Sequence, residues 1–249
     1  KYNLLVNPFP ILPEHFTIPL LIHTPQRILE NYEDMMRIAS SLDDYFVFYN
    51  GPKCGASAPD HMHFQAGKRG EVPLERDWDE IYWKKRTRIY PISDEEYAEA
   101  SSLEEIVDHA GMYSLRGYLC PGFVIVTRTP SANAFLFRKL YGALCGDGCA
   151  EEPMMNILTW VYKGVDDDSK RIVSVVIPRS KHRPECYNAE GEDQILVSPG
   201  AIDMGGLIIT PREQDFKAMT PSVASDIIKE VGISQDEEMQ ILKRLKGIE

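Results

Sequence analysis

Two long apolar segments, residues 155–162 and 172–178, flank the acidic loop 164–170, which begins with a glycine. Both segments are rich in Ile, Val and aromatic residues, the types that favour β-strands. Two strand patterns on either side of a short polar loop predict a β-hairpin. The sequence therefore indicates that this part of the chain folds as an antiparallel sheet.

Shorter apolar runs predict further strands on both sides of this hairpin. These runs are residues 2–6, 16–22, 45–49, 61–67, 123–126 and 201–210. Helices are expected after Thr24-Pro25, where apolar residues recur at three- and four-residue spacing, and around residues 132–144. The charged stretch 71–116 predicts short helices at 94–100 and 103–109, and Pro221 precedes one or two C-terminal helices within 222–249.

The two halves of the chain share a weak pattern. Residues 3–6, followed by a strand that ends Ile18-Pro19, resemble residues 156–159, followed by a strand that ends Ile177-Pro178. The first half then has a strand with two histidines, whereas the expected counterpart, residues 202–210, has none. We expect a duplicated unit in which only one copy keeps its chemistry.

The overall charge argues against one class of partner. The 249 residues carry a formal net charge of -11, and an acidic chain repels phosphate backbones, so we expect no nucleic-acid partner. A small anion remains compatible, because a few cations and backbone N–H groups can hold it. No apolar run approaches the ~20 residues that span a bilayer, so we expect no membrane partner and a cytoplasmic location. The chain opens at Lys1 without an initiator Met, and we expect further residues upstream.

The cysteine pattern does not predict a disulfide scaffold. The chain has five cysteines, an odd number, and no C-x-x-C pair, and it is long enough to build its own apolar core. Cys145 and Cys149 flank Gly-Asp-Gly and could form half of a zinc site. Free thiols are the preferred interpretation of all five.

The segment His61-x-His63-x-Gln65 is the sharpest chemical feature of the sequence. Alternate side chains of a strand share a face, so all three polar groups are expected on one face and Met62 and Phe64 on the other. A pair of histidines at this spacing has two other interpretations. The two side chains could bind a metal ion, or one could be a buried, hydrogen-bonded core residue while the other faces solvent. The glutamine and the glycine-rich loop before the strand favour phosphoryl chemistry.

That loop offers groups suited to an anion. It runs from residue 50 to residue 60 and is made of small and turn-forming residues. Its backbone N–H groups, a hydroxyl and an ammonium group would suit a phosphate. The candidate substrate-binding residues here are Asn50, Lys53, Gly55 and Ser57.

Two segments resemble signatures of the histidine-triad (HIT-like) superfamily. Residues 7–19, with their Pro-rich turn and His15, resemble the first signature, and residues 55–65 resemble the second. Glutamine at Gln65 resembles the transferase branch, which contains galactose-1-phosphate uridylyltransferase, ATP adenylyltransferase and the GDP-hexose phosphorylases. Residues 61–66, His-x-His-Phe-Gln-Ala, resemble the last group most. The resemblance covers residues 2–67 well and 155–216 more loosely. The loop between Ser57 and His61 has one residue more than the uridylyltransferases and adenylyltransferases.

The resemblance implies a fold and a division of the chain. The expected fold is α+β, with two HIT-like halves built of antiparallel sheets and packed helices. Residues 1–90 would form the catalytic half and 91–220 a connector and a second, degenerate half. The C-terminal helices would occupy 221–249.

The resemblance also implies a covalent mechanism. His63 would attack the α-phosphorus of a nucleotide and form a nucleotidyl-imidazole intermediate, with its other ring nitrogen held by the backbone carbonyl of His61. Gln65 would hydrogen-bond a phosphate oxygen but cannot supply a proton, which favours a good leaving group and transfer over hydrolysis. A neutral imidazole is a competent nucleophile near pH 7.

Three further residues are weaker candidates. His15 matches the position of a conserved family histidine and either lines the site or lies in a surface loop. Arg179 and Lys181 belong to a cationic cluster after a strand, which either grips an outer phosphate or sugar phosphate or forms a solvated basic turn.

The preferred hypothesis is a nucleotidyltransferase or phosphorylase. Its substrate would be a nucleotide sugar or a dinucleoside polyphosphate, and its acceptor phosphate or a sugar phosphate. No cofactor is expected for catalysis, although a structural zinc or a magnesium-bound substrate is compatible, as is a homodimer. The alternatives are a nucleotide-binding protein that has lost turnover and a metal-dependent phosphohydrolase that uses His61 and His63.

Overall fold

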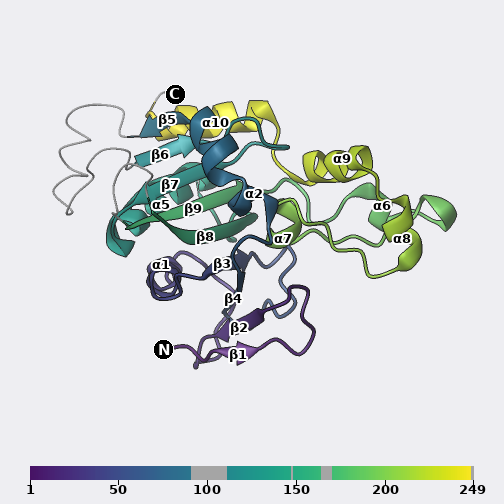
Figure 1. Cartoon of the computed structure of the whole chain (residues 1–249). Helices are drawn as coiled ribbons and strands as arrows, with labels where there is room; N and C mark the ends of the chain where they lie inside the picture. The colour runs from purple at the N-terminus through teal and green to yellow at the C-terminus, as the bar shows by residue number, and fades with distance from the viewer. Residues whose placement is uncertain (91–110, 147, 164–169, 248–249) are drawn as a thin grey trace.

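One antiparallel sheet runs through the molecule. The computed structural model describes residues 1–90, 111–146, 148–163 and 170–247. In these residues nine strands pair in the order β1-β2-β4-β3-β8-β9-β7-β6-β5 (Figure 1). The strands are β1 (Leu5–Val6), β2 (His15–Pro19), β3 (Tyr45–Asn50), β4 (His63–Lys68), β5 (Thr87–Tyr90), β6 (Gly111–Ser114), β7 (Phe123–Thr127), β8 (Met155–Lys163) and β9 (Lys170–Pro178). The predicted α+β class, with antiparallel strands and packed helices, is confirmed.

The predicted hairpin forms the centre of this sheet. β8 and β9 pair from Met155↔Pro178 to Lys163↔Lys170 without a break. Residues 155–162 are all buried, because helices cover the strands on both faces. The helices predicted at 94–100 and 103–109 lie outside the described residues, as does most of the predicted loop 164–170.

The two halves of the sheet repeat one arrangement. In the first half, β2 leads through helix α1 (Tyr32–Ser41) to β3 and β4, and the strands lie in the order β2-β4-β3. In the second half, β7 leads through α5 (Pro130–Cys145) to β8 and β9, in the order β7-β9-β8. The halves join where β3 pairs with β8. The counterpart of the histidine-bearing strand β4 is therefore β9, and the register of the repeat expected from residues 3–6 and 156–159 is wrong. The proposed boundaries at residues 90 and 220 stay a prediction.

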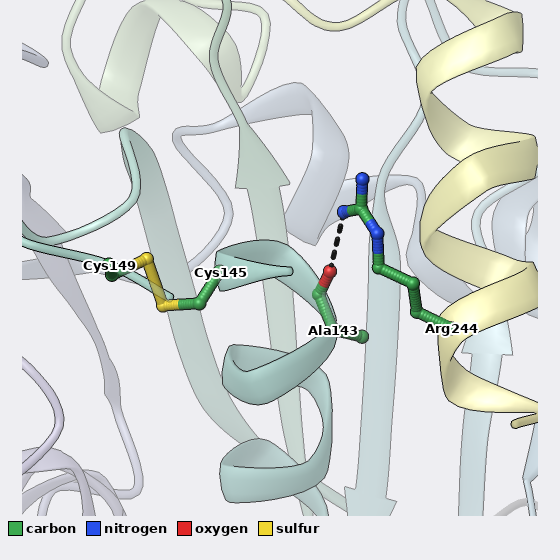
Figure 2. Close-up of a disulfide and its surroundings, with 4 residues drawn as sticks. All are labelled: Ala143, Cys145, Cys149 and Arg244. Carbon is green, nitrogen blue, oxygen red and sulfur yellow. Dashed lines mark hydrogen bonds between the residues drawn. A yellow bond between two sulfur atoms is a disulfide. The ribbon is translucent and has the colours of Figure 1, made fainter. Parts of the chain in front are cut away.

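Helices α1 and α5 cover one face of the sheet. The predicted apolar stripe of α1 is buried through Tyr32, Met35, Met36 and Ala39. α5 begins where the Thr129 side chain accepts from the backbone N–H of Ala132 and Pro130 occupies the first turn. α10 (Gln235–Leu245) packs against the end of α5, where Arg244 donates to the Ala143 carbonyl at 2.9 Å (Figure 2).

The remaining helices lie on the opposite face of the sheet or beyond the ends of its strands (Figure 1). They are α2 (Pro73–Arg76), η1 (Trp78–Tyr82), α3 (Trp83–Lys85), α6 (Glu185–Asn188), η2 (Gly191–Asp193), α7 (Ala201–Met204), α8 (Glu213–Ala218) and α9 (Pro221–Val231). α6, α8 and α9 gather beyond one end of the strands (Figure 1). None of the helices in the described ranges is long and apolar enough to cross a membrane.

The strand predicted at residues 201–210 is wrong. Residues Ala201–Met204 form the short helix α7, and the chain then continues without regular structure past Gly206, whose φ is +99°. The apolar side chains of α7 are buried against β3 and β8, so their pattern records burial and not strand pairing.

The preferred interpretation of Cys145 and Cys149 as free thiols is also wrong. Their sulfur atoms form a disulfide that ties the last residue of α5 to the segment leading into β8 (Figure 2). As a disulfide, these sulfurs cannot serve as thiolate ligands of a zinc ion. Cys54, Cys120 and Cys186 are free thiols.

Candidate active site

A cavity of about 520 Å³ opens on the face of the sheet opposite α1 and α5. Its floor comes from β3 and β4, which contribute Phe48, Asn50 and Gln65. One side is formed by the predicted loop through Gly55 and Ser57, and the other by residues 196–211 of the second half. No Lys or Arg side chain is among the described residues that line it.

The His63 ring is oriented by its neighbour. Its Nδ1 lies 2.8 Å from the backbone carbonyl oxygen of His61, so Nδ1 carries the proton and donates. Nε2 then keeps its lone pair. It makes no hydrogen bond within the residues that the structure describes, so the lone pair is free. The contact with the His61 carbonyl is the one expected from the family resemblance.

Burial sets the charge state of this ring. His63 is only 6% exposed. Burial lowers the pKa of His63 below its ordinary 6.5, and the hydrogen bond to the His61 carbonyl opposes that shift in part. The ring is therefore neutral at pH 7, the state that a nucleophile requires. His63 does not itself line the cavity, whose wall on β4 begins at Gln65.

Gln65 is held by His15. The backbone N–H of Ile11 donates to His15 Nδ1 at 3.3 Å, so the ring proton sits on Nε2 and is donated to Gln65 Oε1 at 2.7 Å. Burial lowers the pKa of His15, while the bond to Gln65 opposes the shift. Because the carbonyl end of the Gln65 amide is occupied, its NH2 end is available to the cavity that both residues line.

His61 contributes its carbonyl but not its side chain. β4 begins at His63, so His61 lies before the strand, and the prediction that three side chains share one face is wrong for this residue. Its Nε2 donates to the Leu20 carbonyl at 2.8 Å, and its ring packs against His23 at 4.6 Å between centroids.

The glycine-rich loop meets the second half of the chain directly. Gly55 has a φ of +90°, and a Cβ built on it would lie 2.7 Å from Gly200 Cα. Asn50 Oδ1 accepts from Asn156 Nδ2 at 3.0 Å and from the backbone N–H of Ala201 at 2.7 Å. The loop and the 200–201 segment are thus held together at the base of the cavity.

Arg179 stabilises the same contact between the glycine-rich loop and residues 200–201. Its guanidinium is buried and donates to Asn156 Oδ1 at 2.8 Å and to the Pro199 carbonyl at 2.9 Å. Its remaining N–H groups donate to the backbone carbonyls of residues 181, 182 and 231. The expected grip on a substrate phosphate would require breaking these bonds, so in this structure Arg179 supports the cavity wall.

Two predicted cations lie away from the cavity. Lys53 forms an exposed ion pair with Glu151 at 2.6 Å. It lines a different cavity, which residues 25–27 and 150–152 help to form. Lys181 pairs with Glu230 at 2.9 Å on the surface. The structure therefore brings five of the predicted residues together around the cavity, namely His15, Asn50, Gly55, Ser57 and Gln65. His63 lies two residues before Gln65 on β4 without lining the cavity, and these lysines lie outside it.

Sequence reasoning missed several residues that build the site. Asn156 and Gln26 make long-range hydrogen bonds that no local pattern announces. Asp203 accepts from the backbone N–H groups of Gly200 at 2.9 Å and Ile209 at 2.8 Å, and so shapes the wall. Burial raises the pKa of Asp203 to about 6, although these N–H groups oppose the shift. From the sequence Asp203 is a possible general base, but no pattern there places it near His63.

Metal ligands are not clustered in the described part of the chain. No group of three His, Cys, Asp or Glu side chains there is placed to hold a metal ion. One ring nitrogen of His61 and one of His63 are each bonded to a backbone carbonyl.

Comparisons with known proteins agree with this architecture. Residues 1–68 match the profile of a family described as a domain of unknown function (DUF4922). No curated protein sequence matches the chain. The fold is that of a phosphorylase of known structure. The crystal structure of yeast Ap4A phosphorylase Apa2 covers 94% of this chain, which in turn covers 72% of that one, at 19% identity and a TM-score of 0.60. The same enzyme in complex with AMP matches with a TM-score of 0.61 at 19% identity, covering 94% of this chain and 73% of that one.

Proposed function

We propose that this protein is a nucleotidyltransferase of the phosphorylase type, which splits a nucleotide phosphoanhydride through a covalent intermediate on His63. The observation that carries the proposal is the pairing of His63 Nδ1 with the His61 carbonyl, which leaves a neutral Nε2 with a free lone pair, two residues before the cavity-lining Gln65 on β4. The shared fold with a phosphorylase supports the same reaction class.

The first step forms a phosphorus–nitrogen bond. Nε2 of His63 attacks the α-phosphorus, and the bond between that phosphorus and the bridging oxygen breaks. The departing phosphate carries the electron pair away and needs no proton, because phosphates are good leaving groups at neutral pH. The ring becomes cationic in this step, and the bond from Nδ1–H to the His61 carbonyl strengthens as it does.

The second step returns the enzyme to its starting state. An oxygen of inorganic phosphate or of a sugar phosphate attacks the same phosphorus, and the phosphorus–nitrogen bond breaks. Gln65 donates its amide N–H to a non-bridging oxygen and supplies no proton in either step. Water is a poor competitor, because the described lining residues that could act as a general base are already engaged. Both ring nitrogens of His15 are hydrogen-bonded within the protein, and both oxygens of Asp203 accept from backbone N–H groups.

The substrate brings a charge that the cavity does not fully match. Since no lysine or arginine lines the described cavity, the phosphates must be neutralised by backbone N–H groups, by Ser57 and Gln65, and by a divalent cation that accompanies the substrate. The substrate is a dinucleoside polyphosphate or a nucleotide sugar. The fold match supports the first, and the resemblance of the segment around His63 to the GDP-hexose phosphorylases supports the second.

A labelling experiment tests the proposal. The protein is incubated with diadenosine tetraphosphate, GDP-hexose or UDP-hexose carrying ³²P at the α-position, with and without Mg²⁺, and then quenched in denaturant. We expect label that is stable in alkali, labile in acid, and discharged by added phosphate. His63→Ala should abolish it, whereas His182→Ala, which changes an exposed histidine outside the cavity, should retain it. Nucleotide binding without label or turnover would identify the nucleotide-binding alternative, and equal labelling of His63→Ala would refute the mechanism.

A further inference from the structure

Strands β3 and β4 separate where the nucleophile lies. They pair from Tyr45↔Lys68 to Phe48↔Gln65, and the ladder ends there. The continuation of this register would place Asn50 opposite His63. That pair does not form, although Asn50 stays paired with Asn156 of β8 on the other edge of β3.

The backbone of His63 needs partners on that side. On the other side of β4, Leu20 N–H donates to the Met62 carbonyl, and His63 stands opposite Pro19. Hydrogen-bonded and non-hydrogen-bonded pairs alternate along an antiparallel ladder, so the N–H and C=O of His63 point away from β2 and toward β3. A buried N–H or C=O without a partner costs about 1–3 kcal/mol.

The side chain of Gln26 fills this gap. It is 1% exposed and lies between the two strands. Gln26 Oε1 accepts from the His63 N–H at 2.9 Å. Gln26 Nε2 donates to the His63 carbonyl at 3.0 Å and to the Asn50 carbonyl at 3.0 Å. One carboxamide thus takes the place of strand pairing for both the backbone N–H and the backbone C=O of His63, and it links them to the end of β3.

The backbone of Gln26 is anchored as well. Its N–H donates to the Pro59 carbonyl at 3.0 Å, in the same loop that supplies Gly55 and Ser57 to the cavity. The residue therefore fixes the glycine-rich loop and the nucleophile relative to each other.

We infer that Gln26 is a positioning residue for the His63 nucleophile, because its carboxamide fixes the peptide from which the His63 ring is aimed. The His63 ring donates from Nδ1 to the backbone carbonyl of His61, two residues earlier. A shift of the 61–63 backbone would therefore displace Nε2 and weaken this hydrogen bond at the same time. The effect of Gln26 on catalysis rests on the proposed function. Its effect on the position of the His63 ring does not.

Two variants separate positioning from stability. Gln26→Met keeps most of the volume and removes all three hydrogen bonds. Gln26→Asn keeps the amide but is one methylene too short to reach both strands, and it serves if the first variant fails to fold. Asn133→Leu is the matched control: it removes a buried amide that bonds Tyr32 and Thr127 on the helix side of the sheet, away from His63.

The first measurement needs no substrate. In ¹⁵N-histidine NMR spectra of the wild type, we expect the His63 ring as the Nδ1–H tautomer with a pKa below 6.5. In the Gln26 variants the tautomers should mix and the pKa should move back toward 6.5, while Asn133→Leu should show neither change. An unchanged His63 tautomer and pKa in a folded Gln26 variant would overturn the inference, whatever the activity of the protein.

The second measurement is kinetic. Misplacing a reacting group by about 1 Å can cost on the order of 100-fold in rate. We expect the Gln26 variants to lower the rate constant for His63 labelling about 10- to 100-fold with little change in KM, and Asn133→Leu to lower only thermal stability. If the wild type never becomes labelled, the proposed function fails and the NMR result alone decides the role of Gln26. Labelling at the wild-type rate in a folded Gln26 variant would overturn it.

Discussion

The Nε2–H of His15 donates to Oε1 of Gln65 at 2.7 Å, joining β2 to β4 across the floor of the cavity. Because the Ile11 N–H occupies the other ring nitrogen, His15 presents a donor and not an acceptor to Gln65. The pair therefore determines which end of the Gln65 amide faces a phosphate.

The first prediction concerns this pair. In His15→Ala the Gln65 amide can rotate and present its oxygen to the phosphate, a repulsive contact. One hydrogen bond is worth about 1.4 kcal/mol at the upper end, which is about tenfold in rate. We expect kcat/KM to fall about tenfold. Measurement of kcat/KM alongside His182→Ala checks this, and wild-type activity in His15→Ala would show that Gln65 is oriented by something else.

The second prediction concerns acid pH. Burial lowers the pKa of His63 and of His15 below 6.5 in the folded state. The labelling rate should therefore stay flat as pH falls through 6.5 and decline only at lower pH, as the His63 ring becomes protonated. Below pH 6.5 these histidines take up protons in the unfolded chain before they do so in the folded protein. The free energy of unfolding should therefore fall as the pH drops below 6.5. Denaturant titrations of wild type and His63→Asn should diverge there; parallel pH profiles would contradict the buried, neutral ring.

Much of the sheet could be predicted because its signals are local. The apolar runs that became β3, β7, β8 and β9 combine strand-forming residues with nearby turns, and each lies within two residues of its predicted bounds. The segment 201–210 failed because apolar composition reports burial, and a short helix can bury the same residues as a strand.

The site could be predicted only where the chemistry sits close together in sequence. His63, Gln65 and the loop before them lie within about one strand and turn of each other. Gln26 acts on His63 over a separation of 37 residues, and Asn156 acts on Asn50 over 106, so neither has a local signature. A positive charge at Arg179 or Lys53 indicates attraction for phosphate, but only the fold shows that these groups are already bonded to protein oxygens.

The third prediction uses two glycines with the same backbone conformation. Gly55 and Gly70 both have a φ of +90°, but a Cβ on Gly70 meets nothing within 4 Å, whereas one on Gly55 would lie 2.7 Å from Gly200 Cα. Alanine in a left-handed conformation costs about 1–2 kcal/mol, so both variants should lose that much stability. Only Gly55→Ala should also push the cavity walls apart and weaken nucleotide binding at least tenfold, as measured by calorimetry. Equal nucleotide affinity in the two variants would exclude this contact as part of the site.

The fourth prediction concerns the disulfide at the end of α5 (Figure 2). Protein purified without reductant and denatured should titrate three thiols per chain with Ellman's reagent, and five after reduction, because three of the five cysteines are free. A loop this short limits the unfolded chain little, so reduction should cost about 2 kcal/mol. A Cys145→Ser, Cys149→Ser variant should match the reduced protein. Five thiols before reduction would mean that the bond does not form.

The last prediction compares two neighbouring cations, one buried and one exposed. Arg179→Met removes the guanidinium that donates to the Asn156 side chain and to the backbone carbonyls of residues 181, 182, 199 and 231. These acceptors stay beneath the cavity wall without their donor. Each buried acceptor left without a partner costs about 1–3 kcal/mol. We expect that loss in denaturant unfolding, together with weaker nucleotide binding, because the segment that bonds Asn50 through Ala201 is no longer held. Lys181→Met breaks only surface ion pairs and should change neither measurement appreciably. If Arg179→Met kept its stability but lost nucleotide affinity, Arg179 would contact the substrate after all, and its hydrogen bonds to the wall would have to open on binding.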